Sequence, residues 1–171
     1  MLENNLKKIN LLLLDVDGVL TDGSIIYNDR GEEIKIFNVK DGLGIRLLIE
    51  AGIKVYIITG RKSDALKHRC KNLGIDHVFE GVTDKSSLLE LIFKQTGSTS
   101  EETAFIGDDL MDLSIMNMVD TPIAVADAHH LVIKKASIVT TAKGGQGAVR
   151  EISEAILKAK GLWEKIIKRY S

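Results

Sequence analysis

The stretch Leu11–Thr21 reads LLLLDVDGVLT, four leucines followed directly by a segment with two acids, Asp15 and Asp17. An unbroken apolar run predicts a strand that is buried on both faces, as in a parallel sheet covered by helices. Aspartate is a poor strand former, so both acids should lie just past the carboxyl end of the strand, where open α/β sheets bind ligands. Asp17-Gly18 alone is also an ordinary turn signal, but that interpretation leaves Asp15 unexplained.

The rest of the chain alternates between strand-like and helix-like segments. Such alternation predicts an α/β fold with a doubly wound, Rossmann-like parallel sheet. No repeat or linker interrupts it, so residues 1–171 are expected to form a single domain. Strands are expected at 54–58, 76–80, 103–106, 123–125 and 138–140, and helices at 41–52, 63–73, 85–97, 130–136 and 148–160, with one more helix after 107–112 that ends at 119. The only proline, Pro122, is expected just before a strand.

A small hairpin flap is expected at about 23–38, directly after the two acids. Its strands would be 24–27 and 33–38, joined by a turn at Asn28–Gly31 in which Gly31 takes a positive φ. Two strands are rarely stable alone. The flap should therefore rest on another surface, either an oligomer partner or its own domain.

The composition is that of an ordinary globular protein. Lys+Arg 23 against Asp+Glu 24 leaves a net charge of −1, which predicts neither nucleic-acid binding nor binding to a membrane surface. A single cysteine, Cys70, excludes an internal disulfide and suits a reducing compartment. The first ten residues contain no long apolar run. The expected location is the cytoplasm.

The motif D-x-D-G-V-x-T after a hydrophobic strand resembles the first motif of the haloacid dehalogenase (HAD) superfamily of phosphotransferases. The resemblance implies that Asp15 is the nucleophile and Asp17 the general acid and base. It further implies that both help to hold Mg²⁺, Asp17 through its backbone carbonyl. A match to one motif is a hypothesis that the remaining motifs must test.

Three later segments carry further polar groups. Thr59-Gly60 ends a strand and suits a phosphate oxygen, although a strand-ending turn is the commoner explanation. The acids of the segment GDDLMD at 107–112 would repel one another without a cation, and hard oxygen ligands beside phosphate imply Mg²⁺. Taken alone, Lys85 at a helix start is more often a surface lysine.

These segments follow the order of the HAD motifs: Thr59 matches the second, Lys85 the third and Asp108 the fourth. The resemblance implies that Asp108 binds the metal directly and that Asp109 is a second ligand or supports one. Asp112 is expected to orient the loop. Bacterial receiver domains use similar residues in another order, which excludes them.

The spacing of the motifs leaves no room for the large cap domain of many HAD phosphatases. Capless members commonly use a neighbouring subunit to cover the site, so an oligomer is expected. Between Leu11 and Lys160, the segments F-N-V-K-D-G-x-G-I-R, I-I-T-G-R-K, A-V-A-D-A-H and G-G-x-G-A-V-R-E resemble the family of 3-deoxy-D-manno-octulosonate 8-phosphate (KDO-8-phosphate) phosphatases. This resemblance implies a magnesium-dependent homotetramer that acts on a phosphorylated sugar acid in lipopolysaccharide sugar synthesis.

A phosphorylated sugar acid has two anionic ends, which arginine forks can bind bidentately. Two departures from the family pattern are visible. Gln146 replaces an arginine that many relatives carry, and His129-His130 replaces a common His-Pro pair without offering a zinc site. Carried over by position, the substrate contacts of the family fall on Asp17, Asn38, Val39, Lys40, Asp41, Gly42, Arg46, Gly60, Arg61, Arg69 and Lys85.

Three functions remain open on the sequence. The first is KDO-8-phosphate hydrolysis through an aspartyl phosphate. The second is hydrolysis of a nonulosonate (sialic-acid-like) 9-phosphate, since those relatives share the motifs. The third is an inactive HAD-like assembly module, although Asp15, Asp17, Lys85 and Asp108 are all present. The tail 161–171 is expected to be an amphipathic helix end rather than a segment that enters a neighbouring site.

Overall fold

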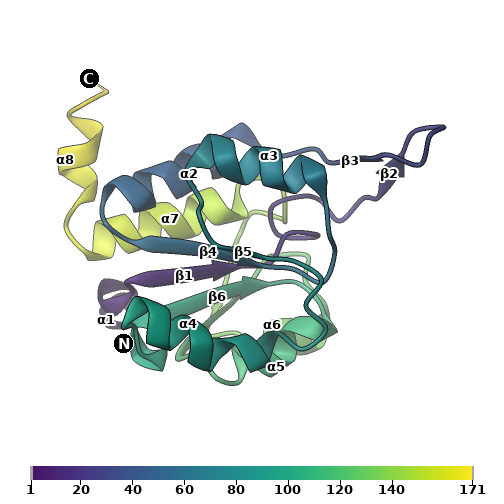
Figure 1. The fold of residues 1–171 in the computed structure, drawn as a ribbon. Coiled ribbons are helices and arrows are strands. Elements are labelled where there is room, and N and C mark those ends of the chain that lie inside the picture. The colour runs from purple at the N-terminus through teal and green to yellow at the C-terminus, as the bar shows by residue number, and fades with distance from the viewer. Residues whose placement is uncertain (1, 171) are drawn as a thin grey trace.

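The computed structural model describes residues 2–170 and places a parallel sheet between two layers of helices (Figure 1). The predicted α/β architecture is confirmed. The sheet order puts the leucine strand in the interior, with a parallel neighbour on each side. The strands lie in the order β5 (Val78–Phe79), β4 (Lys54–Ile58), β1 (Leu11–Leu14), β6 (Thr103–Gly107), β7 (Thr121–Ala124) and β8 (Ile138–Val139).

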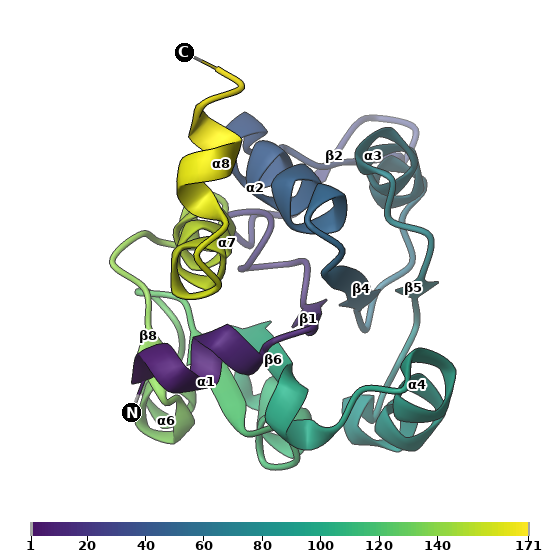
Figure 2. The ribbon, with the colours of Figure 1, turned by 90° about the vertical axis from the view of Figure 1, so that its left-hand side faces the viewer.

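The two helical layers are seen end-on in Figure 2. One layer contains α2 (Val39–Glu50), α3 (Asp64–Leu73), α7 (Ala148–Ala159) and α8 (Trp163–Ile167). The other contains α1 (Leu2–Lys8), α4 (Leu89–Thr96), α5 (Leu113–Met116) and α6 (His130–Lys135), with the short 3₁₀ turns η1 (Lys85–Leu88), η2 (Ser100–Glu102) and η3 (Leu110–Asp112) between elements. The chain moves outward from β1 through β4 and β5, then returns to β6 on the other side of β1. This reversal creates a crevice at the carboxyl ends of β1 and β6.

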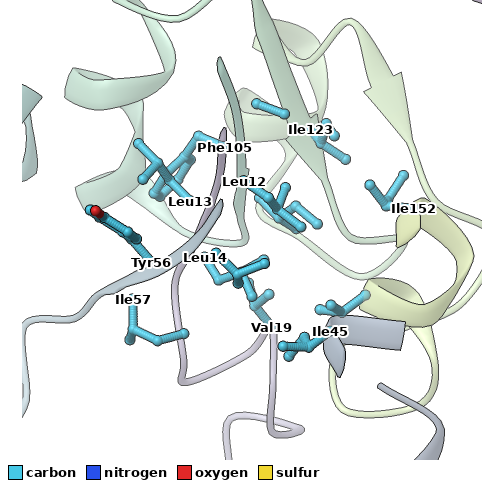
Figure 3. Packing of buried hydrophobic residues seen from close by; sticks show 14 of the residues in the cluster. Leu12, Leu13, Leu14, Val19, Ile45, Tyr56, Ile57, Phe105, Ile123 and Ile152 are labelled. Carbon is cyan, nitrogen blue, oxygen red and sulfur yellow. The ribbon is translucent and has the colours of Figure 1, made fainter. Parts of the chain in front are cut away.

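The leucines of β1 form the centre of the core, and all four are fully buried. Because side chains alternate along a strand, Leu12 and Leu14 face one helical layer and Leu13 faces the other. Figure 3 shows Leu14 near Ile45 of α2, and Leu13 beside Phe105 of β6. Full burial of such side chains contributes roughly 1.5–3 kcal/mol each. The apolar run is explained by this burial on both faces.

The flap is a hairpin of β2 (Ile26–Tyr27) and β3 (Glu33–Ile34) that projects from the body (Figure 1). Gly31 has a φ of +75°, as predicted for the turn. The predicted strands 24–27 and 33–38 are too long. The second ends early because Asn38 caps α2 by accepting a hydrogen bond from the Lys40 N–H (2.8 Å). For the same reason α2 begins at Val39, two residues before the predicted start at Asp41.

Helix α1 was not predicted. Leu6 and Ile9 are buried, and the Lys8 ammonium lies 2.9 Å from the Glu101 carboxylate. The spacing of three residues between Leu6 and Ile9 was a helical signal. The helix after the GDD segment is also shorter than predicted, because it begins as η3 and α5 ends at Met116 rather than at 119.

Pro122 lies inside β7 rather than before it. The strand tolerates a residue without an N–H here because β7 pairs with β8 only from Ile123 onward. The Pro122 carbonyl accepts a hydrogen bond from the Ser137 N–H (2.9 Å), so it points toward the β8 side of the strand. The proline nitrogen faces the same side, just before the first residue pair of β7 and β8, where no strand hydrogen bond is lost.

The C-terminal tail forms α8, separated from α7 by Gly161. Ile166 is buried and Arg169 lies 3.2 Å from the Glu50 carboxylate of α2, so the tail packs on its own chain. Among residues 2–170, none of the helices has both the length and the apolar character needed to cross a membrane.

The loop before α7 braces the turn that follows β1. The Gly145 N–H donates to the Val19 carbonyl (2.9 Å). A Cβ at Gly144 would lie 1.7 Å from the Gly18 carbonyl oxygen, so any other residue would overlap this oxygen and only glycine fits. The two loops are therefore in backbone contact at the edge where the acids lie.

We expect Gly144→Ala to lower the free energy of unfolding by about 2 kcal/mol or more, because neither backbone can move without disturbing the core. Chemical denaturation monitored by circular dichroism would measure this. Gln146→Ala, at an exposed position of the same loop, is the control and should change the value by less than about 0.5 kcal/mol. Equal effects of the two variants would contradict the close contact.

Candidate active site

Asp15 and Asp17 lie directly after β1, as predicted. The Asp15 N–H donates to the Ile106 carbonyl of β6 (3.1 Å), and Asp15 is only 7% exposed. The chain then turns sharply: Gly18 has a φ of +87°, and the N–H groups of the next three residues all donate to the Val16 carbonyl. Both acids line the same pocket as a result.

The Thr21 hydroxyl stabilises this turn. It accepts hydrogen bonds from the Gly18 N–H (3.4 Å) and the Gly23 N–H (3.2 Å), and Thr21 is buried. The threonine of the D-x-D-G-V-x-T motif therefore holds the loop that presents the acids, because its side chain replaces backbone partners that the turn lacks.

Lys85 is buried beside the acids instead of lying on the surface. Asp84 caps η1 by accepting from the Ser86 N–H (3.0 Å), which sets the direction of the Lys85 side chain. The Lys85 ammonium lies 2.5 Å from Asp15 Oδ1 and 2.5 Å from Asp112 Oδ1. Burial alone would lower the pKa of Lys85, but these two carboxylates hold it above its ordinary value. Lys85 is therefore a fixed positive charge next to Asp15.

Three carboxylates form a cluster that could hold a metal ion. Asp15, Asp108 and Asp112 each offer an oxygen, and the three oxygens lie within 4.8 Å of one another. Burial, together with the neighbouring negative charges, raises the pKa of Asp108 to about 8, and burial raises that of Asp15 to about 6. Such carboxylates require a compensating cation, and hard oxygen donors fit Mg²⁺.

Asp112 and Asp109 differ in what their side chains do. The Asp112 carboxylate accepts from the N–H groups of Asp108 (2.8 Å) and Asp109 (3.3 Å), so it orients the loop. The Asp109 carboxylate instead accepts from the Leu110 N–H (2.7 Å) and lies outside the three-carboxylate cluster. The structure thus adds Asp112 to the candidate metal group, where the sequence had favoured Asp109.

A pocket of about 260 Å³ opens above these acids, lined on one side by Thr59, Gly60 and Arg61 from the end of β4. Thr59 is buried, and its hydroxyl accepts from the Arg61 N–H (3.3 Å). The Arg61 Nε atom is buried without a hydrogen-bond partner among the described residues. The pocket therefore presents hydroxyl, amide and guanidinium groups opposite Asp15, a combination that suits a phosphate.

The flap contributes residues that the sequence had not identified. The Lys35 ammonium is hydrogen-bonded to Asp17 Oδ1, and Arg61 Nη2 donates to Glu33 Oε1 (2.8 Å) and to the Tyr27 hydroxyl (3.0 Å). The alternation of Glu33 and Lys35 with isoleucines was a signal for a two-faced strand. The alternation did not show which of the two faces would point toward Asp17.

The remaining predicted substrate residues lie around the start of α2 and do not line this pocket. Asn38 donates to the Gly145 carbonyl (3.2 Å), and Arg69 donates to the Asn38 carbonyl (3.1 Å). The Asp41 carboxylate accepts from the N–H groups of Gly147 and Arg150 at the start of α7. Gly42 is packed against Arg69, whereas Val39, Lys40 and Arg46 are exposed. Their roles in substrate binding stay predictions.

The two departures from the family pattern also have local explanations. His129 caps α6 by accepting from the Leu131 N–H (3.3 Å), and its ring lies 4.3 Å from that of His130. Neither histidine belongs to the carboxylate cluster. Gln146 is exposed, and its N–H donates to the Lys143 carbonyl (3.1 Å).

A parallel α/β sheet with an aspartate pair after its central strand, a buried lysine and a carboxylate cluster defines the class of HAD-like hydrolases. Residues 75–152 match the model of the haloacid dehalogenase-like hydrolase family. The chain is 46% identical to the Escherichia coli (strain K12) 3-deoxy-D-manno-octulosonate 8-phosphate phosphatase KdsC over 155 residues, 91% of this chain and 82% of that protein. The Yersinia pestis KdsC is 48% identical over 151 residues, 88% of this chain and 81% of that protein.

Comparison with solved structures supports the same family assignment. A 3-deoxy-D-manno-octulosonate 8-phosphate phosphatase from Moraxella catarrhalis, solved in complex with magnesium, phosphate and KDO, superposes with a TM-score of 0.96 at 41% identity, covering 99% of this chain and 97% of that one. The cobalt-bound form of the deoxy-D-mannose-octulosonate 8-phosphate phosphatase from Haemophilus influenzae superposes with a TM-score of 0.90 at 44% identity, covering 93% of each chain. The chain therefore belongs to the family of KDO-8-phosphate phosphatases within the HAD-like hydrolases.

The raised pKa values predict how the metal-free protein responds to pH. The folded-state values of about 6 for Asp15 and about 8 for Asp108 exceed the value of about 3.9 for an unfolded aspartate. Their contribution to stability is therefore complete below pH of about 4 and is lost as the pH rises through about 6 and then about 8. In the presence of a chelator, which removes divalent cations, the melting temperature of the protein should fall as the pH rises from about 4 to about 8.

Mg²⁺ competes with the same protons, so the increase in melting temperature that it causes should grow with pH. Differential scanning fluorimetry with and without Mg²⁺ would measure both trends. The control variant Asp108→Asn should lose most of the Mg²⁺ effect and flatten the pH dependence. A Mg²⁺ effect that is independent of pH, or unchanged in Asp108→Asn, would contradict this assignment of the cluster.

Proposed function

We propose that this protein hydrolyses KDO-8-phosphate to KDO and inorganic phosphate in a Mg²⁺-dependent reaction. The observation that carries the chemistry is the position of Asp15, 2.5 Å from the buried Lys85 ammonium and within the carboxylate cluster. The substrate is inferred from the relatives, which are named for this activity at 46–48% identity. The presence of KDO and phosphate in the Moraxella catarrhalis structure supports the same choice.

In the first step, an Asp15 carboxylate oxygen attacks the phosphorus in line with the leaving sugar oxygen. The bond from phosphorus to the sugar oxygen breaks, and Asp17 gives its proton to that oxygen. Lys85, the Thr59 hydroxyl and nearby backbone N–H groups stabilise the charge on the three transferring oxygens. The products of this step are the free sugar and an aspartyl phosphate on Asp15.

In the second step, Asp17 removes a proton from water, whose oxygen attacks the same phosphorus. The Asp15 carboxylate leaves, and phosphate is released. Asp17 thus acts first as an acid and then as a base, and both roles need it within hydrogen-bond reach of the reacting oxygen.

For the metal, we propose Asp15, Asp108 and the Asp17 backbone carbonyl as ligands. Asp112, the third carboxylate of the cluster, orients the Asp108 loop and is a further candidate ligand. Asp109, outside the cluster, stays a second ligand or a supporting residue. When bound, Mg²⁺ neutralises the clustered carboxylates and the phosphoryl oxygens.

The substrate contacts are proposed in two groups. Gly60 and Arg61 line the pocket beside Thr59 and suit the phosphate end. Asn38–Gly42 lie at the amino end of α2, which follows the flap, and Arg69 of α3 donates a hydrogen bond to the Asn38 carbonyl there (3.1 Å). Arg46 lies further along α2. We assign them to the sugar-acid end, because a second anionic group requires cations away from the phosphate.

The exposed apolar side chains of the flap support an oligomer. Ile25, Ile26, Tyr27, Ile34 and Ile36 are between 37% and 70% exposed, although they are neighbours on one small hairpin. Such a patch on a two-stranded hairpin marks a protein contact. We propose a homotetramer in which the flap packs against another copy and the neighbouring subunit closes the open site. We place the enzyme in the cytoplasm, in lipopolysaccharide sugar synthesis.

The activity is tested by phosphate release with Mg²⁺ from KDO-8-phosphate, a nonulosonate 9-phosphate and simple hexose phosphates. We expect a strong preference for KDO-8-phosphate. Asp15→Asn should lower the rate at least about 1,000-fold because it removes the nucleophile. Lys85→Met should lower it about 100-fold or more because it removes the fixed charge.

Preference for the nine-carbon substrate would keep the mechanism and change the substrate. No release from any ester would favour an inactive assembly module. Lys94→Met, on the exposed side of α4, is the matched control for Lys85→Met and should keep the full rate.

The oligomer is tested by Ile36→Lys, which places a charge on the most exposed isoleucine of the flap, at 70%. We expect a smaller assembly by light scattering, because a buried unpaired charge destabilises an interface. Leu91→Lys, at a residue of α4 that is 46% exposed, is the control and should keep the wild-type mass. An unchanged mass for Ile36→Lys would argue against assembly through the flap.

A further inference from the structure

The extended segment Glu33–Ile36, which begins with β3, has two faces of opposite character. The side chains of Glu33 and Lys35 are 13% and 2% exposed, whereas Ile34 and Ile36 are 47% and 70% exposed. Alternate residues of a strand point to opposite sides. The charged side chains therefore point inward to the active site, and the apolar ones point outward. This is the reverse of a hairpin that packs on its own core.

The inward face makes an ionic network around Asp17. Lys35 donates to Asp17 Oδ1, and Glu33 Oε1 lies 3.4 Å from the Lys35 ammonium and 2.8 Å from Arg61 Nη2. Arg61 Nε lies 3.6 Å from Asp17 Oδ2, too far for a hydrogen bond. The negative charges of Asp17 and Glu33 balance the positive charges of Lys35 and Arg61. A buried lysine is costly unless it is paired, so its placement depends on these partners.

We propose that Lys35 is a positioning residue for Asp17 in the reaction described above. Lys35 holds Oδ1, and Oδ2 accepts no hydrogen bond from the part of the chain that the structure describes. Oδ2 is then the oxygen that gives its proton to the sugar oxygen and takes one from water. This inference rests on the proposed phosphatase function and adds a residue of the flap to it.

The anchor matters because proton transfer is sensitive to position. An acid must come within about 2.6–3.2 Å of the oxygen that it protonates, and a displacement of about 1 Å can cost about 100-fold in rate. Asp17 is held by no other side-chain hydrogen bond within residues 2–170. Arg61 is a proposed substrate contact, so Lys35 would be the partner that stays on Asp17 when substrate binds. The flap and the acid then move as one unit.

The experiment compares Lys35→Met with Lys35→Arg, using KDO-8-phosphate and 4-nitrophenyl phosphate with Mg²⁺. For Lys35→Met we expect kcat on KDO-8-phosphate to fall about 10- to 100-fold, since general acid–base catalysis is worth about 100-fold or more. KM should change less than about threefold. Lys35→Arg keeps the charge and should recover kcat to within about fivefold of wild type.

The second ester separates positioning from other roles. 4-Nitrophenolate leaves without protonation, and kcat/KM reports only the steps up to its release. We therefore expect kcat/KM for this ester to fall less than about threefold in Lys35→Met. Lys94→Met is the control for the loss of a lysine and should match wild type on both esters.

Three results would overturn the proposal. A raised KM with unchanged kcat would make Lys35 a substrate contact. An equal loss on both esters with a lowered melting temperature would make it structural, as would no recovery in Lys35→Arg. If Lys35→Met does not fold, Lys35→Gln takes its place. If the wild type prefers another ester of the panel, only the substrate assignment fails, and the same variants are compared on that ester.

Discussion

The site depends on two buried ion pairs that share one cation, those of the Lys85 ammonium with Asp15 and with Asp112. Two carboxylates at the end of a buried strand would repel each other, and burial would favour their protonated forms. Lys85, held by a capped 3₁₀ turn, lies 2.5 Å from both. Asp112 in turn binds the Asp108 N–H and orients that loop. A single cation thus links three segments that are far apart in the chain.

The sheet topology brings these segments together. The chain leaves β1, builds one half of the sheet and returns to β6 on the other side, so the loops after these neighbouring strands face each other. The turn at Gly18 leaves room for this approach, because a Cβ there would lie 2.0 Å from the Asp108 carboxylate. The loop before α7 reaches the same turn from the far end of the chain and closes it through Gly144. The acids are therefore held by backbone contacts as well as by charge.

The flap is a short two-stranded hairpin that projects from the body. Its short strands leave little area for packing, and the side chains of Ile34 and Ile36 face outward. Lys35 and Glu33 face the site instead. The same alternation thus leaves Ile34 and Ile36 exposed and directs charged groups toward Asp17. The open pocket and the exposed isoleucines are two consequences of one short hairpin.

The sequence by itself determined the α/β class, the central strand and two of the three clustered acids, Asp15 and Asp108, because the apolar run, the strand–helix alternation and the motif order are all local patterns. It also located Gly31 in its turn, which depends on a few neighbouring residues. It placed Pro122 before its strand, since the start of β7 depends on its pairing with β6. It also missed α1, although the spacing of Leu6 and Ile9 was a local helical signal.

Only the tertiary structure decided which side chains meet. It showed that Asp112, and not Asp109, joins Asp15 and Asp108, and that Lys35 contacts Asp17 across the flap. A residue's position along the chain sets its element and its face, but its partners depend on how separate elements pack. Contacts between side chains far apart in sequence leave no periodic signal in the sequence. Only the packing of the folded chain determines them.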